Sequence, residues 1–378
     1  MKVYLDNAST TKVSKDVLDS MLPYFTEEFG NPSSLHEQGI NNRKIINKSR
    51  KLVAELLHCK KNEIFFTSCG TESINWAIKG LAYNTSSKGG IITTRIEHHA
   101  TSETCQFLGD RGYSVSYVDV DKEGFIDLDH LRSIVNDNTL LVTVIMANNE
   151  IGTIQNIKEI SKICYDASTY LHVDAVQAAC HTKLDLKELD VDLLSISGHK
   201  FHAPKGVGLL YVKEGTKLAP LIHGGQQELK MRAGTENVAF TVGISRALEI
   251  GIANLGNYTE RLNSYSNLFL KRLDEASVDY ILNGPEIGEN RLPGNLNLSF
   301  KDLDGSVISY LLNKRGIYVS TGSACDSESI EPSHVITAIR VPQDYINATI
   351  RFSIGNETTL EEINYVIDNL IEIIKHEK

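Results

Sequence analysis

The sequence predicts an α/β protein: a large domain with a mostly parallel seven-stranded sheet, followed by a smaller α+β domain. Between about residues 60 and 215, short apolar β-branched runs alternate with longer amphipathic stretches, as in successive βαβ units. A long helical stretch follows near 236–275, and the rest of the chain mixes strand-like and helix-like segments. A chain of 378 residues is long enough to bury the cores of two domains.

The seven expected strands are short apolar runs in the first two thirds of the chain. In order they read IFFTS, GGIITT, YSVSYVDV, LLVTVIMAN, YLHVDA, LLSIS and GVGLLYV. Ligands of open parallel sheets bind outside the carboxyl ends of the strands. The residues that directly follow these runs are therefore the first candidates for a functional site, and they are unusually polar.

The remaining segments predict a division of the chain into three parts. NLNLSF, VISYLLNKR and NATIRFSI, closed by a C-terminal helix, are typical of a small α+β domain. We expect residues 1–14 to pack against this domain, 15–255 to form the large domain and 256–378 the small one. The small, polar, turn-prone residues of 322–332 predict a mobile loop that carries Cys325.

Composition excludes several classes of function. The net charge of -10 and the absence of a long basic run argue against a nucleic-acid partner. No segment is expected to be apolar enough for a signal peptide or a membrane span, which predicts a cytoplasmic protein without a membrane partner. The six cysteines form no C-x-x-C pair, so neither a disulfide framework nor a zinc site is expected.

The strongest local pattern is SISGHKFHAPKG at 195–206, where an apolar strand ends in a turn that carries Lys200. A lysine at a strand end can form a Schiff base with an aldehyde cofactor if its surroundings let it lose a proton. The simpler alternative is a surface lysine. Asp174, at the end of an earlier strand, favours the cofactor, because a buried carboxylate keeps the ring nitrogen of pyridoxal phosphate protonated. Gln177 is placed to reach the ring hydroxyl. Taken alone, an Asp after a strand, such as Asp174, is more often a helix cap than a cofactor ligand.

A phosphate site is predicted where FFTSCG runs into the helix TESINWAIKG. The free N–H groups of a helix start attract anions, so Gly70 and Thr71 are expected to cradle a phosphate, with Ser197 and His199 as further donors. Taken alone, the turn is better explained by an ordinary helix cap at Thr71.

His98 follows another strand, in TRIEHHA, and is a candidate to stack on a flat ring and to move protons. We expect its neighbour His99 to point elsewhere. A metal site built from the histidines is a weak alternative, because they lack the H-E-x-x-H spacing.

Ten ordered motifs carry a family resemblance over nearly the whole chain. They read YLDNAST, GNPSSLH, GTES, EHHA, NNEIG, HVDAVQAA, SGHKFHAPKG, RAGTEN, GSACDS and RFSIG. Together they resemble the cysteine desulfurases, in the NifS- and IscS-like branch of the class V aminotransferases that has a long catalytic loop. Two positions depart from the family pattern, Cys69 in place of glycine and Ser9 in place of alanine, and neither removes a catalytic group.

The resemblance implies a pyridoxal-phosphate enzyme of fold type I. Lys200 would hold the cofactor covalently, and Asp174 would pair with its ring nitrogen. The other residues implied in cofactor binding are Gly70, Thr71, His98, Asn149, Gln177, Ser197, His199 and Thr235. Thr235 would reach the phosphate of the neighbouring subunit, which implies a homodimer.

The substrate and the sulfur acceptor are also implied by the resemblance. Arg351 would clamp the carboxylate of L-cysteine, helped by Asn149, and a guanidinium fork suits that group. The alternatives are a surface salt bridge for Arg351 and a buried structural amide for Asn149. Cys325 would accept the sulfur as a persulfide, although an ordinary free cysteine is more often buried and inert.

In the implied reaction, Lys200 removes the Cα proton, His98 handles the thiol proton, and the substrate leaves as L-alanine. Cys325 would pass its sulfur to an iron–sulfur scaffold protein, with which it would at most share a cluster transiently, or to another acceptor for thio-cofactor synthesis. Aminotransfer, selenocysteine lysis and a catalytically inactive regulator are the alternatives on the same fold. The presence of Lys200, Asp174 and Cys325 argues against a catalytically inactive regulator.

Overall fold

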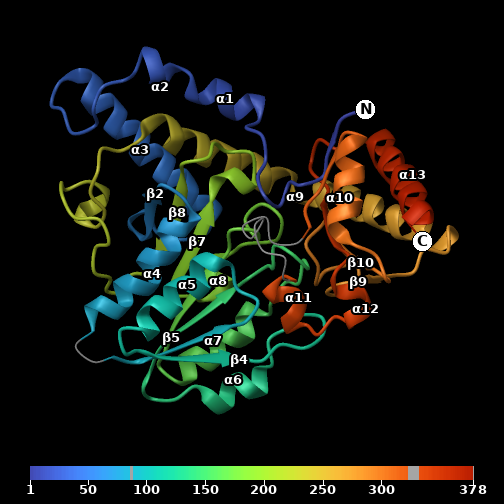
Figure 1. Cartoon of the computed structure of the whole chain (residues 1–378). Coiled ribbons are helices and arrows are strands. Elements are labelled where there is room, and N and C mark those ends of the chain that lie inside the picture. Colours follow the sequence, from blue (N-terminus) through green and yellow to red (C-terminus); the bar gives the residue numbers. More distant parts are fainter. Residues whose placement is uncertain (86–87, 322–331, 378) are drawn as a thin grey trace.

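A computed structural model of the chain describes residues 1–85, 88–321 and 332–377, and its largest element is a seven-stranded sheet (Figure 1). The strand order is β2-β8-β7-β6-β5-β3-β4. Only β8 runs against its neighbours, so the sheet is mixed but mostly parallel, which confirms the predicted fold class. The strands are β2 (Ile64–Thr67), β3 (Gly90–Thr94), β4 (Ser114–Val118), β5 (Thr139–Ile145), β6 (Tyr170–Asp174), β7 (Leu193–Ser197) and β8 (Gly208–Val212).

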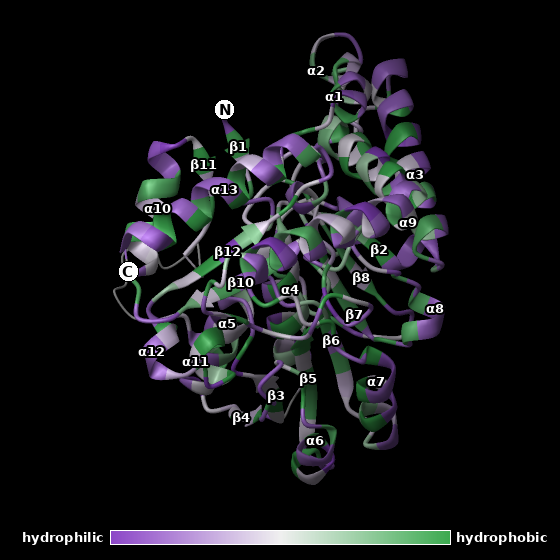
Figure 2. Cartoon of the chain, turned by 90° about the vertical axis from the view of Figure 1, so that its right-hand side faces the viewer, coloured by the Kyte–Doolittle hydropathy of each residue, from purple (hydrophilic) through white to green (hydrophobic). Residues whose placement is uncertain are grey.

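Both faces of this sheet are buried, because consecutive residues of its strands belong to different apolar clusters. Phe65, Leu141 and Leu193 pack with one cluster, whereas the next residue of each strand packs with the other. This alternation follows from the period of two along a strand. Figure 2 accordingly shows β5 mostly in the hydrophobic colour, whereas α6 and α7 alternate between the two colours.

Helices cover the two faces of the sheet. One face carries α4 (Gly70–Asn84) and α5 (His99–Gly109), and the other carries α3 (Glu37–Leu56) and α7 (Ile157–Asp166). The remaining helices before residue 200 are α1 (Lys15–Met21), α2 (Pro23–Thr26), α6 (Leu128–Ile134), α8 (Leu186–Leu189) and the short 3₁₀ turns η1 (Lys61–Glu63) and η2 (Gly198–Lys200).

A second core lies around a three-stranded antiparallel sheet of order β12-β10-β9. Its strands are β9 (Tyr280–Leu282), β10 (Asn295–Phe300) and β12 (Thr349–Ser353), and its helices are α10 (Gly305–Lys314), α11 (His334–Ala338), α12 (Gln343–Ile346) and α13 (Leu360–Glu377). β1 (Val3–Tyr4) pairs in parallel with β11 (Ile317–Tyr318), so the N-terminus lies beside α10 (Figure 1). Val3 and Leu5 join this second core.

Helix α9 (Val238–Glu275) runs through both cores. Ile244 and Leu248 pack with the large sheet, and Leu262 and Phe269 pack with the second core. By length and composition alone, α9 is long and apolar enough to cross a membrane, so the expectation that no segment meets this criterion is wrong. Half of its most apolar window is buried within the protein, and α9 is a core helix. The predicted domain boundary near residue 255 falls inside this helix and stays a prediction.

Phe269→Ala tests the second core. The ring is fully buried and lies 5.1 Å from that of Phe352, between ring centres. We expect the free energy of unfolding to fall by about 3–5 kcal/mol, because the substitution leaves a cavity. In the matched control, Tyr165→Ala at a 76% exposed side chain, the change should stay within about 0.5 kcal/mol. Guanidinium unfolding followed by circular dichroism measures both, and equal losses would contradict a packed core at Phe269.

Candidate active site

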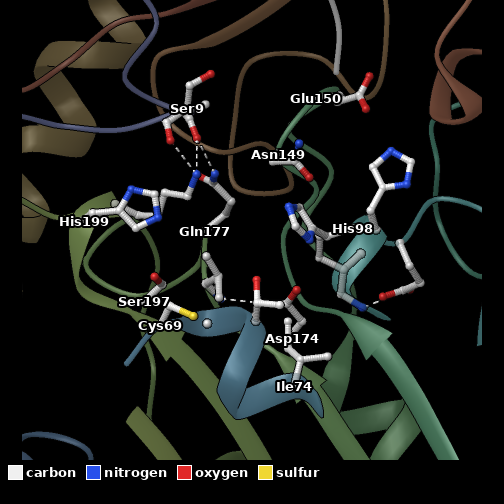
Figure 3. A pocket seen from close by; sticks show the side chains of 18 of the residues that line it. Ser9, Cys69, Ile74, His98, Asn149, Glu150, Asp174, Gln177, Ser197 and His199 are labelled. Carbon is white, nitrogen blue, oxygen red and sulfur yellow. Dashed lines mark hydrogen bonds between the residues drawn. The ribbon is translucent and has the colours of Figure 1, made fainter. Parts of the chain in front are cut away.

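A cavity of about 310 Å³ opens at the carboxyl ends of the parallel strands. Its walls come from the residues that follow β2, β3, β5, β6 and β7 and from the N-terminal segment. Ten of the predicted site residues line it: Gly70, Thr71, His98, Asn149, Asp174, Gln177, Ser197, His199, Lys200 and Arg351. In Figure 3, Ser197 and His199 lie on one side of Asp174, and His98 and Asn149 lie on the other.

Asp174 is the last residue of β6 and its side chain is only 2% exposed. Burial raises the pKa of the Asp174 carboxyl to about 6, although the N–H of Val176 and the nearby charge of Lys200 act against this shift. Val176 N donates to Oδ1 at 2.9 Å. The carboxylate is thus charged at neutral pH in a site where charge is costly, and a cation in the cavity would stabilise it.

Lys200 ends the 3₁₀ turn η2 that follows β7. Its Nζ donates hydrogen bonds to the carbonyl oxygens of Ala8 and Ser9, both at 2.8 Å. Gln177 Nε2 donates to the same Ala8 carbonyl at 2.8 Å. The N-terminal segment therefore forms the wall against which the lysine amine rests, so Lys200 is a pocket residue and not the surface lysine of the alternative reading.

The predicted phosphate turn lies at the start of α4. The helix cap is Cys69, whose Sγ accepts from Glu72 N at 3.4 Å, and the alternative of a cap at Thr71 is therefore wrong. Cys69 is half-buried and lines the cavity. A Cβ on Gly70 would lie 2.8 Å from Val176 Cγ2 and 3.1 Å from Ser197 Cβ, so a larger residue would force Val176 to shift. A helix start with free N–H groups at the cavity suits a phosphate.

Two neutral imidazoles flank the cavity. Burial lowers the pKa of His98 to about 4, helped by Lys200 and two neighbouring histidines. Burial and the charges of Lys200 and Lys205 lower the pKa of His199 to about 4 as well. His98 Nδ1 accepts from Ala100 N at 3.0 Å, which caps α5 and fixes the ring. Both rings therefore face the cavity uncharged at neutral pH.

Arg351 lies in the middle of β12 and is 1% exposed, which excludes the alternative of a surface salt bridge. Nη1 donates to the Asn149 carbonyl at 3.0 Å, and Nη2 donates to Asp6 Oδ1 at 2.9 Å and to Ser9 Oγ at 2.8 Å. Nε is buried and has no partner among the described residues. Arg351 itself lines the cavity, and a guanidinium suits a carboxylate ligand.

Several residues that line the cavity were not expected from the sequence. Glu97 is buried, and burial raises the pKa of its carboxyl to about 8. His99, expected to point elsewhere, also lines the cavity, and its ring centre lies 4.9 Å from that of His334. Glu97 and His99 adjoin His98, so the rule of inspecting strand ends would have found them. Glu150 adjoins Asn149 and Ser9 lies in the motif YLDNAST, so both could have been found in the same way, whereas His334 comes from a distant segment and carries no local signal.

Two predicted residues are not among those that line the cavity. Thr235 is exposed and lies in the loop before α9. Cys325 lies outside the described residues. Within the described ranges no cluster of three or more His, Cys, Asp or Glu side chains is arranged to hold a metal ion.

The residue set fits pyridoxal phosphate. A glycine-lined helix start suits the phosphate, a buried carboxylate suits the ring nitrogen, and a lysine at a strand end suits the aldehyde. Asp174 supports the fit most directly, because its buried carboxylate needs a cationic partner, and Gly70 lets the start of α4 approach Val176 and Ser197 closely. The individual roles of the site residues stay predictions.

Comparison with known proteins agrees with this fit. The family model for class-V aminotransferases matches residues 3–366. The chain is 48% identical to the cysteine desulfurase IscS of Dictyoglomus turgidum, over 99% of this chain and 95% of that protein. It is also similar to the solved structure of a NifS-like protein, with a TM-score of 0.94, 39% identity and full coverage of both chains. A structure described as SspA in complex with cysteine gives a TM-score of 0.83 and 34% identity, over 95% of this chain and all of that one.

The depressed pKa of His98 yields a prediction that needs no cofactor. A folded-state pKa of about 4 lies below the usual value near 6.5, so the ring should stay neutral from pH 8 down to about pH 5. ¹⁵N NMR of the histidine side chains measures this, and His98→Gln identifies the signal by its loss. A titration midpoint near pH 6.5 for that signal would show that the ring is not buried as described.

Proposed function

Because the chain belongs to the class-V aminotransferases and, within them, to the cysteine desulfurases, we propose that it removes sulfur from L-cysteine, releases L-alanine and carries the sulfur on Cys325 as a persulfide. The observation that supports this proposal most strongly is the cavity in which Asp174, Lys200 and Arg351 meet. Asp174 and Lys200 would act on a cofactor, and Arg351 would bind the carboxylate of an amino-acid substrate.

The family depends on pyridoxal phosphate, and this chain would hold it through the residues that line the cavity. When bound, the cofactor supplies an electron sink for negative charge at the substrate Cα. Gly70, Thr71 and the start of α4 would hold the phosphate, with Ser197, His199 and Thr235 as further donors. Asp174 would keep the ring nitrogen protonated, Gln177 would reach the ring hydroxyl, and His98 and Asn149 would lie against the ring.

Arg351 would bind the substrate carboxylate. Its guanidinium is held rigidly by Asp6, Ser9 and the Asn149 carbonyl, and the buried Nε still lacks a partner among the described residues. A fixed fork orients the amino acid without a further loss of side-chain freedom.

Lys200 would remove the Cα proton. The carbonyls of Ala8 and Ser9 accept hydrogen bonds from Nζ, so they stabilise the ammonium that forms when the amine takes up this proton. His98 would handle the thiol proton of the substrate. Its Nδ1 accepts from Ala100 N, so the neutral ring carries its own proton on Nε2 and has to give up that proton or the Nδ1 bond before it can act as a base.

The sulfur step is assigned to Cys325, which lies outside the described residues. Its thiolate would attack the substrate sulfur, so that an S–S bond forms while the C–S bond breaks and leaves its electron pair on carbon. Burial raises the pKa of Cys59, Cys105 and Cys164 to about 12, and it raises that of Cys180 as well. These four thiols are therefore poor nucleophiles, which leaves Cys69 and Cys325. The thiol of Cys69 lines the cavity and caps α4 by accepting from Glu72 N, so the choice of Cys325 over Cys69 rests on the family resemblance.

A homodimer is part of the proposal. Thr235 is exposed, and large apolar side chains near its loop are exposed too: Leu22, Phe25, Phe29, Ile222 and Leu229. Phe25 packs edge-on against Phe240 in the first turn of α9, so α2 lies against the helix that follows this loop. Such a surface suits a second copy of the chain. An iron–sulfur scaffold or another acceptor would take the sulfur; the acceptor, the cytoplasmic location and the three-part division of the chain stay predictions.

Cys325→Ser tests the function. The variant should bind pyridoxal phosphate with the same visible absorption band but release sulfide from L-cysteine, under a reducing thiol, at least about 100-fold more slowly than wild type, because a serine hydroxyl is not ionised at neutral pH. Cys59→Ser is the matched control and should keep its rate. Sulfide release at the wild-type rate from Cys325→Ser would refute Cys325 as the sulfur acceptor. Bound cofactor with turnover of another amino acid instead of L-cysteine would refute the substrate.

A further inference from the structure

The loop that carries Thr235 is braced against the large sheet. We call residues 222–237, between β8 and α9, the arm; it lies at the left edge of the molecule in Figure 1, away from α10 and α13. The arm is folded on itself, since Ala233 N donates to the Ile222 carbonyl at 3.3 Å and Gly234 N donates to Gln227 Oε1 at 3.0 Å. It is therefore a defined element although it contains almost no regular structure.

A left-handed turn lies inside the arm. Glu228, Leu229 and Lys230 have φ angles of 42°, 56° and 70°, a run of left-handed residues none of which is glycine. Each such residue costs about 1–2 kcal/mol of backbone strain, so the surroundings must hold the turn in place. The buried carboxylate of Glu228 does so: it accepts two hydrogen bonds from Arg50, at 2.7 and 2.8 Å, and one from Phe66 N at 2.9 Å.

A second ion pair joins the arm to the phosphate turn. Arg232 Nε donates to Glu72 Oε1 at 2.8 Å and Nη2 donates to Oε2 at 3.1 Å, a fork on a carboxylate whose side chain is 9% exposed. The same carboxylate accepts from Ser68 N at 2.7 Å. Burial alone would raise the pKa of Glu72, but hydrogen bonds from Arg232 and Ser68 outweigh it, and the pKa lies below its usual value.

These contacts connect the start of α4 to the arm through the Arg232–Glu72 pair. Glu72 directly follows Thr71 in the first turn of α4, where the cofactor phosphate is proposed to bind, and Arg232 lies three residues before Thr235. A phosphate that fixes the turn from Ser68 to Thr71 also fixes Glu72, and through it Arg232 and the end of the arm. Thr235 itself is exposed and is not among the residues that line the cavity of its own subunit.

We propose that the Arg232–Glu72 pair couples the phosphate turn of one subunit to the part of the arm that reaches the other subunit, so that cofactor binding and subunit pairing strengthen each other. This inference rests on the proposed homodimer and the proposed cofactor site. Arg232 is then a positioning residue, because it acts through Glu72 and Thr235. Since coupling between two binding events is reciprocal, a cofactor that orders the arm must also bind more tightly to the dimer.

Subunit exchange measures this coupling without using activity. Two populations of the full-length protein, labelled with donor and acceptor fluorophores, are mixed with and without saturating pyridoxal phosphate, and energy transfer reports the exchange rate. In wild type the cofactor should slow exchange at least about 10-fold, within the usual range of coupling between sites. In Arg232→Gln the cofactor should change the exchange rate less than about 2-fold.

The control variant is Arg315→Gln. Arg315 also makes a forked pair, through Nη1 and Nη2 with Glu372 at 2.8 and 3.0 Å, far from the arm, so this variant should keep the wild-type response. A merely structural role of Arg232 would change the exchange rate equally with and without cofactor. If Arg232→Gln does not fold, as judged by its melting curve, Arg232→Lys takes its place and should show a reduced response, because an ammonium cannot fork.

The outcomes separate the inference from the proposed function. A wild-type dimer that the cofactor stabilises, together with an Arg232→Gln dimer that it stabilises equally, would overturn the coupling and leave the homodimer standing. A wild-type dimer whose exchange does not respond to bound cofactor would overturn the coupling too. A wild-type protein that stays monomeric with cofactor bound would overturn both proposals.

Discussion

The parallel pairing of β5, β6 and β7 decides where the polar groups of the cavity lie. The register pairs Ile145 with Asp174 and Asp174 with Ser195, so the chain leaves all three strands at one edge of the sheet. Asn149 follows β5, Asp174 ends β6, and Lys200 follows β7. A carboxylate and an amine from different strands thereby share one buried space, where each lowers the cost of the other's charge.

The opposite wall depends on contacts between the two ends of the chain. Ala8 and Ser9 hold the amine of Lys200, and Asp6 holds Arg351, which comes 345 positions later. The pairing of β1 with β11 fixes this segment on the second core. The cavity therefore needs both cores, and a change in how they pack would move Arg351 relative to Asp174.

Much of this arrangement was predictable from the sequence because it follows local rules. The seven apolar runs and the long helix near 236–275 became β2 to β8 and α9, and the strand-end rule found Asp174 and Lys200. The motifs gave the family and the function, which the comparisons confirm. What local rules could not give is which distant segments meet. His334 reaches the carbonyl of Glu97 at 2.8 Å across 237 positions, and no pattern near either residue indicates this contact. The cap of α4 was misplaced because a cysteine thiol, a rare cap, took the position.

The account depends most on Asp174 as the partner of a protonated ring nitrogen. The direct test is ¹⁵N NMR of pyridoxal phosphate labelled at the ring nitrogen and bound to wild type and to Asp174→Asn at pH 8. We expect the chemical shift of a protonated nitrogen in wild type and of an unprotonated nitrogen in the variant, because the amide cannot stabilise the cation. An unprotonated nitrogen in wild type, or the same shift in both proteins, would contradict the account.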